Sequence, residues 1–220
     1  MGIFMKKVNY QAMLDGIIKN IPEKEQPPRL LMHSCCAPCS SYCLSYLAEY
    51  FSITVLYYNP NISPEDEYYK RVKEQVRLIG SLPVKNVISF VEGGYEPLKF
   101  FQMAEGMEDM PEGGARCFKC YEMRQRKAAE YAVMHGFDYF TTTLSVSPHK
   151  NAQVLNETGL RLEKEYGVKY LVSDFKKKGG YQKSIQYSRE YSLYRQDYCG
   201  CIFSKKEREQ ERTARILEQH

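Results

Sequence analysis

Residues 30–39, LLMHSCCAPC, combine a short apolar run with a cysteine-rich turn and a proline. Residues 30–34 are typical of a buried strand, because short apolar runs bounded by turn signals suit the inside of a sheet. Pro38 stands where proline commonly begins a helix. The stretch therefore predicts a strand, a tight turn and a helix, with thiol side chains concentrated at the end of the strand.

The same alternation of strand and helix continues through most of the 220 residues. Apolar runs predict further strands at residues 53–58, 86–91, 138–143 and 169–172. Helical spacing predicts helices at residues 10–21, 38–51, 64–80, 96–104, 116–135, 151–166, 181–191 and 205–217. This order is typical of an α/β fold, a parallel sheet of about five strands with helices on both faces, plus a helical C-terminal extension. Ligands of such sheets bind beyond the carboxyl ends of the strands.

Length and composition predict a single α/β domain over residues 1–220. Hydrophobic residues make up 43% and charged residues 26% of the chain, which is typical of globular proteins. Within it we expect an N-terminal helix and linker at residues 1–28 and a basic helical segment that carries a CxC motif at residues 175–220. There is no apolar run long enough for a membrane span, and residues 1–20 lack the features of a secretory signal. We therefore expect a cytoplasmic protein without a membrane partner.

The formal net charge is +4, and its positive excess lies in one segment. Residues 175–220 contain eleven Lys or Arg and six Asp or Glu, a net charge of +5, which leaves −1 for the rest of the chain. The tyrosines interleaved with these charges are Tyr181, Tyr187, Tyr191, Tyr194 and Tyr198. Basic residues with aromatic side chains suit a phosphate backbone and unstacked bases, although a solvated lysine-rich surface has the same composition.

Eight cysteines are unusual for a protein expected in a reducing compartment, where disulfides do not persist. Seven of them fall into three groups: Cys35, Cys36 and Cys39; Cys117 and Cys120; Cys199 and Cys201. Thiols at such spacings can bind a common metal centre, and the predicted helix starts near Cys39 and Cys117 favour the thiolate. Gly200 allows a tight turn inside the last group. The eighth, Cys43, lies in an amphipathic run and is expected in the core.

The spacing of the cysteines alone leaves the metal open. Four thiolates from CxxC and CxC motifs could hold structural zinc or a [4Fe–4S] cluster. A structural zinc site uses four ligands, whereas this chain offers seven grouped thiols. A redox iron site with an additional metal or an open position therefore explains the surplus better.

Polar side chains also follow two other predicted strands. Residues 138–150, DYFTTTLSVSPHK, place five hydroxyls, His149 and Lys150 after a strand, where such groups can hold phosphate or ribose. Residues 59–62 follow another strand and should face the same edge of the sheet. An ordinary Ser/Thr-rich loop and an ordinary turn would have the same composition. The glycine motifs of classical ATP and dinucleotide sites do not occur.

Five motifs, HSCCAPC, YNPNI, RCFKCYEMR, FTTTLSVSPHK and YRQDYCGCIFS, together resemble the QueH family of epoxyqueuosine reductases over residues 33–204. The resemblance implies a nucleotide α-hydrolase-like (HUP) fold, with the CCAPC turn in place of a glycine-rich phosphate loop. It implies a cobalamin-independent oxidoreductase that converts epoxyqueuosine in tRNA to queuosine, the last step of queuosine biosynthesis. The cofactors that it implies are a [4Fe–4S] cluster and an additional iron ion.

The resemblance also suggests roles for individual residues. The expected cluster ligands are Cys117, Cys120, Cys199 and Cys201, and the cysteines expected to serve the second iron are Cys35, Cys36 and Cys39. The candidate proton donors are His33, Tyr121 and His149. The residues expected to contact tRNA or substrate are Asn59, Asn61, Thr142, Thr143, Ser145, Lys150 and Arg195. The expected partners are the tRNA anticodon stem-loop and an electron donor of the ferredoxin or flavodoxin type. An iron–sulfur tRNA thiolase and a zinc-stabilised RNA-binding module are the alternatives.

Overall fold

The computed structural model describes residues 8–22 and 26–217 of the chain. Parts of both predicted end segments, residues 1–7, 23–25 and 218–220, lie outside the described residues. The described part contains one parallel sheet of five strands in the order β3-β2-β1-β4-β5. The strands are β1 (Arg29–His33), β2 (Ser52–Tyr57), β3 (Ile88–Glu92), β4 (Tyr139–Thr142) and β5 (Lys169–Tyr170). The predicted fold class is thereby confirmed.

At β1 the chain changes the side of the sheet on which it adds strands. From β1 the chain adds β2 and β3 on one side, and then crosses back to add β4 and β5 on the other. In sheets of this kind the ligand crevice lies beyond the carboxyl ends of the strands at such a switch point. His33, the last residue of β1, pairs with Thr142, the last residue of β4. The loops that follow these two strands therefore start side by side.

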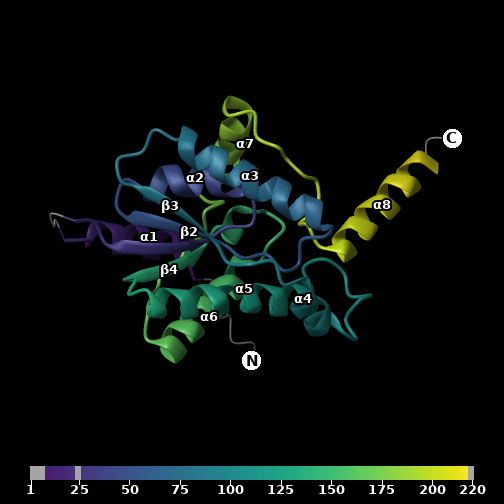
Figure 1. Ribbon diagram of the computed structural model, residues 1–220, viewed down its shortest axis with the longest axis horizontal. Helices are drawn as coiled ribbons and strands as arrows, with labels where there is room; N and C mark the ends of the chain where they lie inside the picture. The colour runs from purple at the N-terminus through teal and green to yellow at the C-terminus, as the bar shows by residue number, and fades with distance from the viewer. Residues whose placement is uncertain (1–7, 23–25, 218–220) are drawn as a thin grey trace, which may run out of the picture.

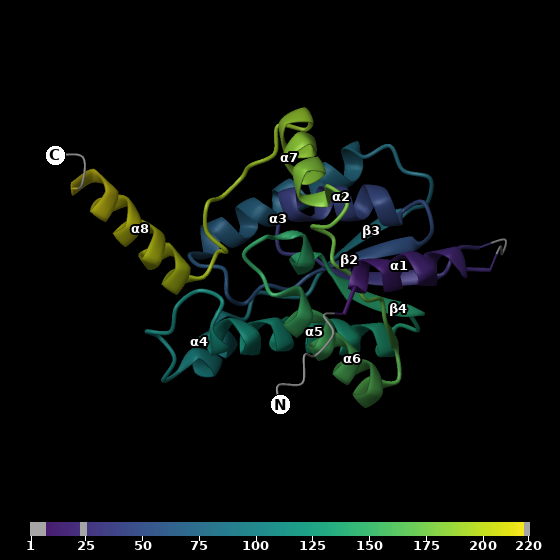
Figure 2. The ribbon, with the colours of Figure 1, turned by 180° about the vertical axis from the view of Figure 1, so that it is seen from behind.

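Helices cover both faces of the sheet (Figure 1). The helices are α1 (Tyr10–Lys19), α2 (Ala37–Leu47), α3 (Glu65–Ser81), α4 (Pro97–Ala104), α5 (Ala115–Met134), α6 (Ala152–Tyr166), α7 (Gly180–Glu190) and α8 (Ile202–Leu217), with a 3₁₀ turn η1 (Thr143–Val146) after β4. α2, α3 and α7 lie on one face and α5 and α6 on the other, while α8 projects from the body, as the view from behind also shows (Figure 2). Within the described ranges, every helix is too short or too polar to cross a bilayer.

Two clusters of buried side chains fill the space between the sheet and its helices. In β1, Leu30 and Met32 join the cluster beneath α2 and α3, whereas Leu31 joins the cluster beneath α5 and α6. This alternation is the two-residue period of a strand, and coverage of both faces explains why three consecutive residues of the strand, 30–32, are apolar. Cys43 is fully buried in the first cluster, as predicted for the eighth cysteine.

The close approach of α6 to β5 gives a test of this packing. A Cβ atom on Gly159 would lie 2.3 Å from the ring of Tyr170, which is itself buried. We expect Gly159→Ala to lower the free energy of unfolding by about 1–3 kcal/mol, as overpacking does. The matched control is Gly16→Ala in α1, which has open space around it and should stabilise by up to about 1 kcal/mol. Equal midpoints of the two variants in urea denaturation would contradict the packing.

Candidate functional site

The three cysteine groups lie at the N-termini of three helices. Cys36 is the N-cap of α2, and Cys39 lies in the first turn of that helix. Cys117 lies in the first turn of α5, and Cys201 immediately precedes α8. Free N–H groups and the helix dipole stabilise negative charge at such positions. The backbone therefore favours thiolates in all three groups, but burial opposes it and raises the pKa of Cys117 and Cys120.

The first group, Cys35, Cys36 and Cys39, forms a compact site of three thiols. Their Sγ atoms all lie within 4.8 Å of one another, and those of Cys35 and Cys36 are 3.9 Å apart. Among the described residues, no other three Cys, His, Asp or Glu side chains come so close. Metal–sulfur bonds of about 2.3 Å in tetrahedral geometry place sulfurs roughly 3.8 Å apart. The three thiols could therefore hold one metal ion and leave a fourth position for another ligand.

One of these thiols is favoured as a thiolate. Hydrogen bonds from Cys36 and Cys39, and the nearby Arg124 cation, hold the pKa of Cys35 well below its usual range. Hydrogen bonding to Cys35 raises the pKa of Cys36 to about 12, and it also raises the pKa of Cys39. Because metal ions bind the thiolate, Cys35 offers the first ligand for an incoming ion.

The other two cysteine groups, distant in sequence, meet in the folded chain. Cys120, Cys199 and Cys201 pack together beside Phe100. Cys117 packs in the cluster that contains Cys35, so it borders both sets of thiols. These four thiols stand farther apart than the first three, since they form no group within 4.8 Å. A cluster of several irons is larger than a single zinc ion, so this wider spacing suits the cluster better.

Two backbone N–H groups and one hydroxyl lie within hydrogen-bond distance of three of these sulfurs. The backbone N–H of Gly113 donates to Cys117 Sγ, and that of Ser204 donates to Cys201 Sγ, both at 3.3 Å. The hydroxyl of Ser204 lies 3.1 Å from Cys199 Sγ. Hydrogen bonds to the sulfurs are one of the features by which proteins set the potential of iron–sulfur clusters. The donor set and its surroundings therefore fit such a cluster.

The turn at Gly200 is fixed by its contacts with the start of α3. Gly200 has φ +112°, and a Cβ atom there would lie 2.9 Å from the Ile62 side chain and 3.0 Å from the Arg71 guanidinium. Arg71 donates a hydrogen bond to the carbonyl of Cys199 at 3.3 Å, and Ser63 N–H donates to the carbonyl of Gly200 at 3.0 Å. The predicted need for glycine between the two cysteines is confirmed.

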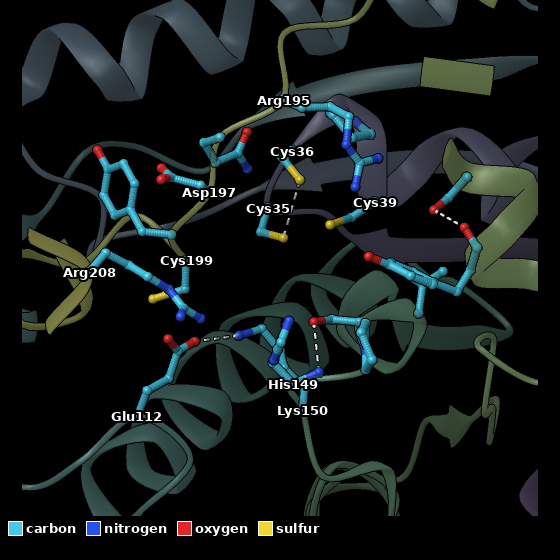
Figure 3. A pocket seen from close by; sticks show the side chains of 18 of the residues that line it. Cys35, Cys36, Cys39, Glu112, His149, Lys150, Arg195, Asp197, Cys199 and Arg208 are labelled. Carbon is cyan, nitrogen blue, oxygen red and sulfur yellow. Dashed lines mark hydrogen bonds and ion pairs between the residues drawn. The ribbon is translucent and has the colours of Figure 1, made fainter. Parts of the chain in front are cut away.

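A cavity of about 270 Å³ opens between the cysteine groups (Figure 3). Cys35, Cys36 and Cys39 line one side of it, and Cys199 faces them across the space. The loop after β4 and the segment before α8 complete the walls. The cavity thus lies at the switch point of the sheet, where the loops after β1 and β4 meet.

Three residues that the sequence predicts as functional line this cavity: His149, Lys150 and Arg195. Lys150 Nζ lies 3.9 Å from a carboxylate oxygen of Glu112, as Figure 3 shows. Burial acts to lower the pKa of Lys150, but Tyr121 and Cys199 outweigh it and raise the pKa above its usual range. Lys150 is therefore a cation at neutral pH, directed toward the cavity.

Five other predicted contact residues are buried and do not line the cavity: Asn59, Asn61, Thr142, Thr143 and Ser145. The Asn59 amide donates to the carbonyl of Ser34 at 2.8 Å, and the Ser145 hydroxyl lies 2.9 Å from that of Ser173. These bonds hold the loops that surround the cavity. Direct substrate contact by the five residues stays a prediction.

His33 is buried, and both of its ring nitrogens have partners. Nδ1 lies 2.9 Å from the Thr142 hydroxyl, and Nε2 lies 3.2 Å from the Tyr58 carbonyl. Because a carbonyl only accepts, Nε2 carries the proton and Nδ1 accepts from Thr142. Burial, and then Arg124, lower the pKa of His33 to about 4. The neutral ring links β1 to β4 and to the end of β2, and it does not line the cavity.

The buried His33 should make the stability of the metal-free protein depend on pH. Its pKa is about 4 in the folded chain against 6.5 when exposed, so the unfolded chain takes up the proton first as the pH falls. Stability is therefore full above pH 6.5 and is lost toward pH 4, by about 2 kcal/mol between pH 7 and pH 5. His33→Gln should remove this part of the pH dependence in urea denaturation. An unchanged slope in the variant would argue against a neutral buried ring.

The hydroxyl of Tyr121 is buried and has no hydrogen-bond partner among the described residues. Its ring packs with Cys35, Cys36 and Cys117. Burial raises the pKa of Tyr121 to about 12, so the hydroxyl keeps its proton at neutral pH. A buried polar group without a partner costs roughly 1–3 kcal/mol. A group bound beside the thiols would relieve that cost by accepting the hydrogen bond.

Four charged residues of the cavity were not predicted as site residues from the sequence: Glu112, Arg124, Asp197 and Arg208. Arg124 could have been found, because it follows Cys117 by seven residues and Cys120 by four. That spacing puts both cysteines and Arg124 on one face of α5. Glu112 lies in the irregular segment between α4 and α5, where no periodicity marks a residue as inward-facing.

Comparison with known proteins finds relatives over most of the chain. A protein-family model described as "Epoxyqueuosine reductase QueH" matches residues 30–207. The chain is 44% identical over 203 residues to a protein of that name from Staphylococcus epidermidis, with 90% of this chain and 85% of the relative covered. A namesake from Streptococcus pyogenes is 42% identical over 203 residues, with 91% and 80% covered. One from Haemophilus influenzae is 42% identical over 178 residues, with 80% and 71% covered.

Proposed function

The chain belongs to the epoxyqueuosine reductase family QueH, and we propose on this basis that it reduces epoxyqueuosine in tRNA to queuosine. The reaction removes the epoxide oxygen. Two electrons and two protons enter, both carbon–oxygen bonds break, a carbon–carbon double bond forms and one water leaves. The observation that carries the proposal is the cavity at the switch point of the sheet, where Cys35, Cys36 and Cys39 face Cys199. The remaining three grouped cysteines, Cys117, Cys120 and Cys201, pack beside these thiols.

We infer that two iron centres are bound by the two sets of thiols. The cluster ligands would be Cys117, Cys120, Cys199 and Cys201, and the ligands of an additional iron would be Cys35, Cys36 and Cys39. The compact spacing of the first three thiols and the wider spacing of the other four support this division. When bound, these groups would supply electrons one at a time and Lewis acidity at an open iron position. The proposed reaction does not use cobalamin.

The protons must come from groups beside the cavity. Tyr121 keeps its proton at neutral pH. Its ring packs against the thiols, and its hydroxyl has no hydrogen-bond partner among the described residues. His149 lines the cavity directly. His33 is less suited, since its Nε2–H is engaged with the Tyr58 carbonyl. We therefore favour Tyr121 and His149 as the proton donors, and assign His33 a positioning role.

The basic residues at the mouth of the cavity would hold the tRNA. Lys150 and Arg195 line the cavity, and so does Arg208 from the basic C-terminal segment. Basic side chains and tyrosines together suit the phosphates and unstacked bases of an anticodon stem-loop. Electrons would come from a donor of the ferredoxin or flavodoxin type, and the protein would act in the cytoplasm.

Binding of tRNA should weaken as the salt concentration rises. Binding releases cations from the phosphates, and a higher salt concentration makes that release less favourable. With two or more phosphate contacts, we expect at least a roughly fivefold loss of affinity between about 50 and 200 mM salt. Arg195→Ala should reduce the slope of log affinity against log salt by about 1. Arg161→Ala is the matched control, since Arg161 pairs with Glu122 on the far side of the sheet from α2 and α7. Filter binding that shows no salt dependence would contradict the backbone contacts.

A direct assay tests the proposed reaction. Anaerobically purified protein with a chemical reductant should convert epoxyqueuosine in tRNA to queuosine, detected by nucleoside mass spectrometry as the loss of one oxygen. Conversion that requires ATP would favour a thiolase-like enzyme instead. Stoichiometric zinc without sulfide, and no conversion, would favour the zinc-stabilised RNA-binding module.

A further inference from the structure

We propose that Arg124 is a positioning residue whose fixed positive charge stabilises the reduced state of the iron–sulfur centre. The inference rests on the proposed function, because it concerns the centre that the cysteines would hold. It assigns a role to a residue that is neither a thiol ligand nor one of the candidate proton donors.

Arg124 is a buried cation without a carboxylate partner. Its exposed fraction is 3%, and it forms no ion pair with Asp or Glu in the described part of the chain. The other two buried arginines each have an acidic neighbour: Arg71 pairs with Glu67 at 2.7 Å, and Arg116 lies 3.8 Å from Glu207. A buried charge is costly unless an opposite charge compensates it. The compensation for Arg124 must therefore come from something other than a carboxylate.

The position of Arg124 indicates what that compensating charge is. Its Nε donates to the carbonyl of Cys120 at 3.2 Å, and its Nη1 lies 3.5 Å from the side-chain oxygen of Asn59. The guanidinium lines the cavity together with Cys35 and Cys199. It thus lies near both sets of thiols, and the neighbouring side chains that would carry negative charge with a metal bound are those of Cys35, Cys120 and Cys199.

A fixed cation beside the cluster makes its reduction more favourable. Each electron that enters a cluster adds one negative charge, and in a buried site a nearby positive charge stabilises the reduced form more than the oxidised form. The reduction potential therefore rises. Arginine suits this role better than lysine or histidine, because it stays protonated in any environment. Among the described residues no carboxylate pairs with Arg124, so its charge is directed at the thiol-bound centre.

The test is the reduction potential of the bound cluster, which needs no tRNA and no turnover. Wild type, Arg124→Gln and Arg124→Lys are reconstituted anaerobically, assayed for iron and sulfide, and titrated spectroscopically against potential. Arg124→Gln should make reduction at least tenfold less favourable at a given potential, a shift of about 59 mV to more negative values for a one-electron couple. Arg124→Lys should retain most of the wild-type potential. Arg126→Gln, a half-exposed arginine of the same helix paired with Glu122 and Glu165, is the matched control and should not shift it.

The outcomes separate this inference from the proposed function. An unchanged potential in Arg124→Gln, or an equal shift in Arg124→Lys, would overturn the role of the charge while leaving the reductase assignment intact. A wild-type protein that binds no iron–sulfur cluster would overturn both. If Arg124→Gln does not retain a cluster, Asn59→Asp gives the same information, because a carboxylate facing Arg124 should cancel its charge and shift the potential in the same direction. An unshifted Asn59→Asp potential would count against the inference.

Discussion

A Cys117→Ala variant is expected to lose the iron–sulfur cluster and, with it, the reduction of epoxyqueuosine. Cys117 is one of the four proposed cluster ligands, packs with Cys35 and receives a hydrogen bond from Gly113 N–H. Removal of a direct ligand should cost more than the roughly 10- to 100-fold lost when an outer-shell partner is changed. We expect activity in the tRNA assay to fall by more than about 100-fold, with a parallel loss of sulfide.

The matched control for this variant is Cys43→Ala. Cys43 is equally buried but packs in the core beneath α2, away from the cavity. Its loss should cost about 1 kcal/mol of stability through the small void left behind, with iron and sulfide contents unchanged. A Cys117→Ala protein that keeps its sulfide and activity would defeat the assignment of the cluster ligands.

The second large effect is expected from Cys36→Ala. Cys36 belongs to the compact trio that is spaced for a single ion, and it is not among the four more widely spaced thiols. We therefore expect this variant to keep the cluster and its sulfide but to lose the additional iron and more than about 100-fold of the activity. Iron and sulfide analysis, together with the tRNA assay, gives both readouts on one sample.

The two variants together test how the thiols are divided. If Cys36→Ala lost sulfide in proportion to iron, Cys36 would be a ligand of the cluster, and the division between the two sets would be wrong. If it kept full activity, the trio would have no part in the reaction. Only a selective loss of iron agrees with two separate centres.

Local sequence patterns were sufficient to predict most of the secondary structure. The apolar run before the cysteine turn predicts β1, and Pro38 marks the start of α2. The predicted strand at residues 138–143 ends one residue early, because the Thr142 hydroxyl accepts a hydrogen bond from Leu144 N–H and turns the chain into η1. The predicted strand at residues 169–172 is shorter in the structure, where only Lys169 and Tyr170 pair with β4. These boundaries depend on individual hydrogen bonds that a periodicity does not contain.

The arrangement of the site depended on contacts that no local pattern records. The sequence predicts that cysteines gather at one edge of the sheet, but it does not show that Cys117 borders the first group. It also does not separate residues that line the cavity, such as Lys150, from those that brace its loops, such as Asn59. Both lie in polar loops after strands. The order of the strands, which comes from long-range pairing, decides which of them meet the cavity.

The most direct test of the two-centre site is Mössbauer spectroscopy of protein reconstituted anaerobically with ⁵⁷Fe, combined with sulfide analysis. With both iron centres bound, we expect about five irons and about four sulfides per chain. One spectral component should come from the cluster and a separate component from the single iron. Cys36→Ala should lose only the single-iron component. A single metal ion bound by four thiols without sulfide, or one iron component that no variant of Cys35, Cys36 or Cys39 alters, would contradict the two-centre site.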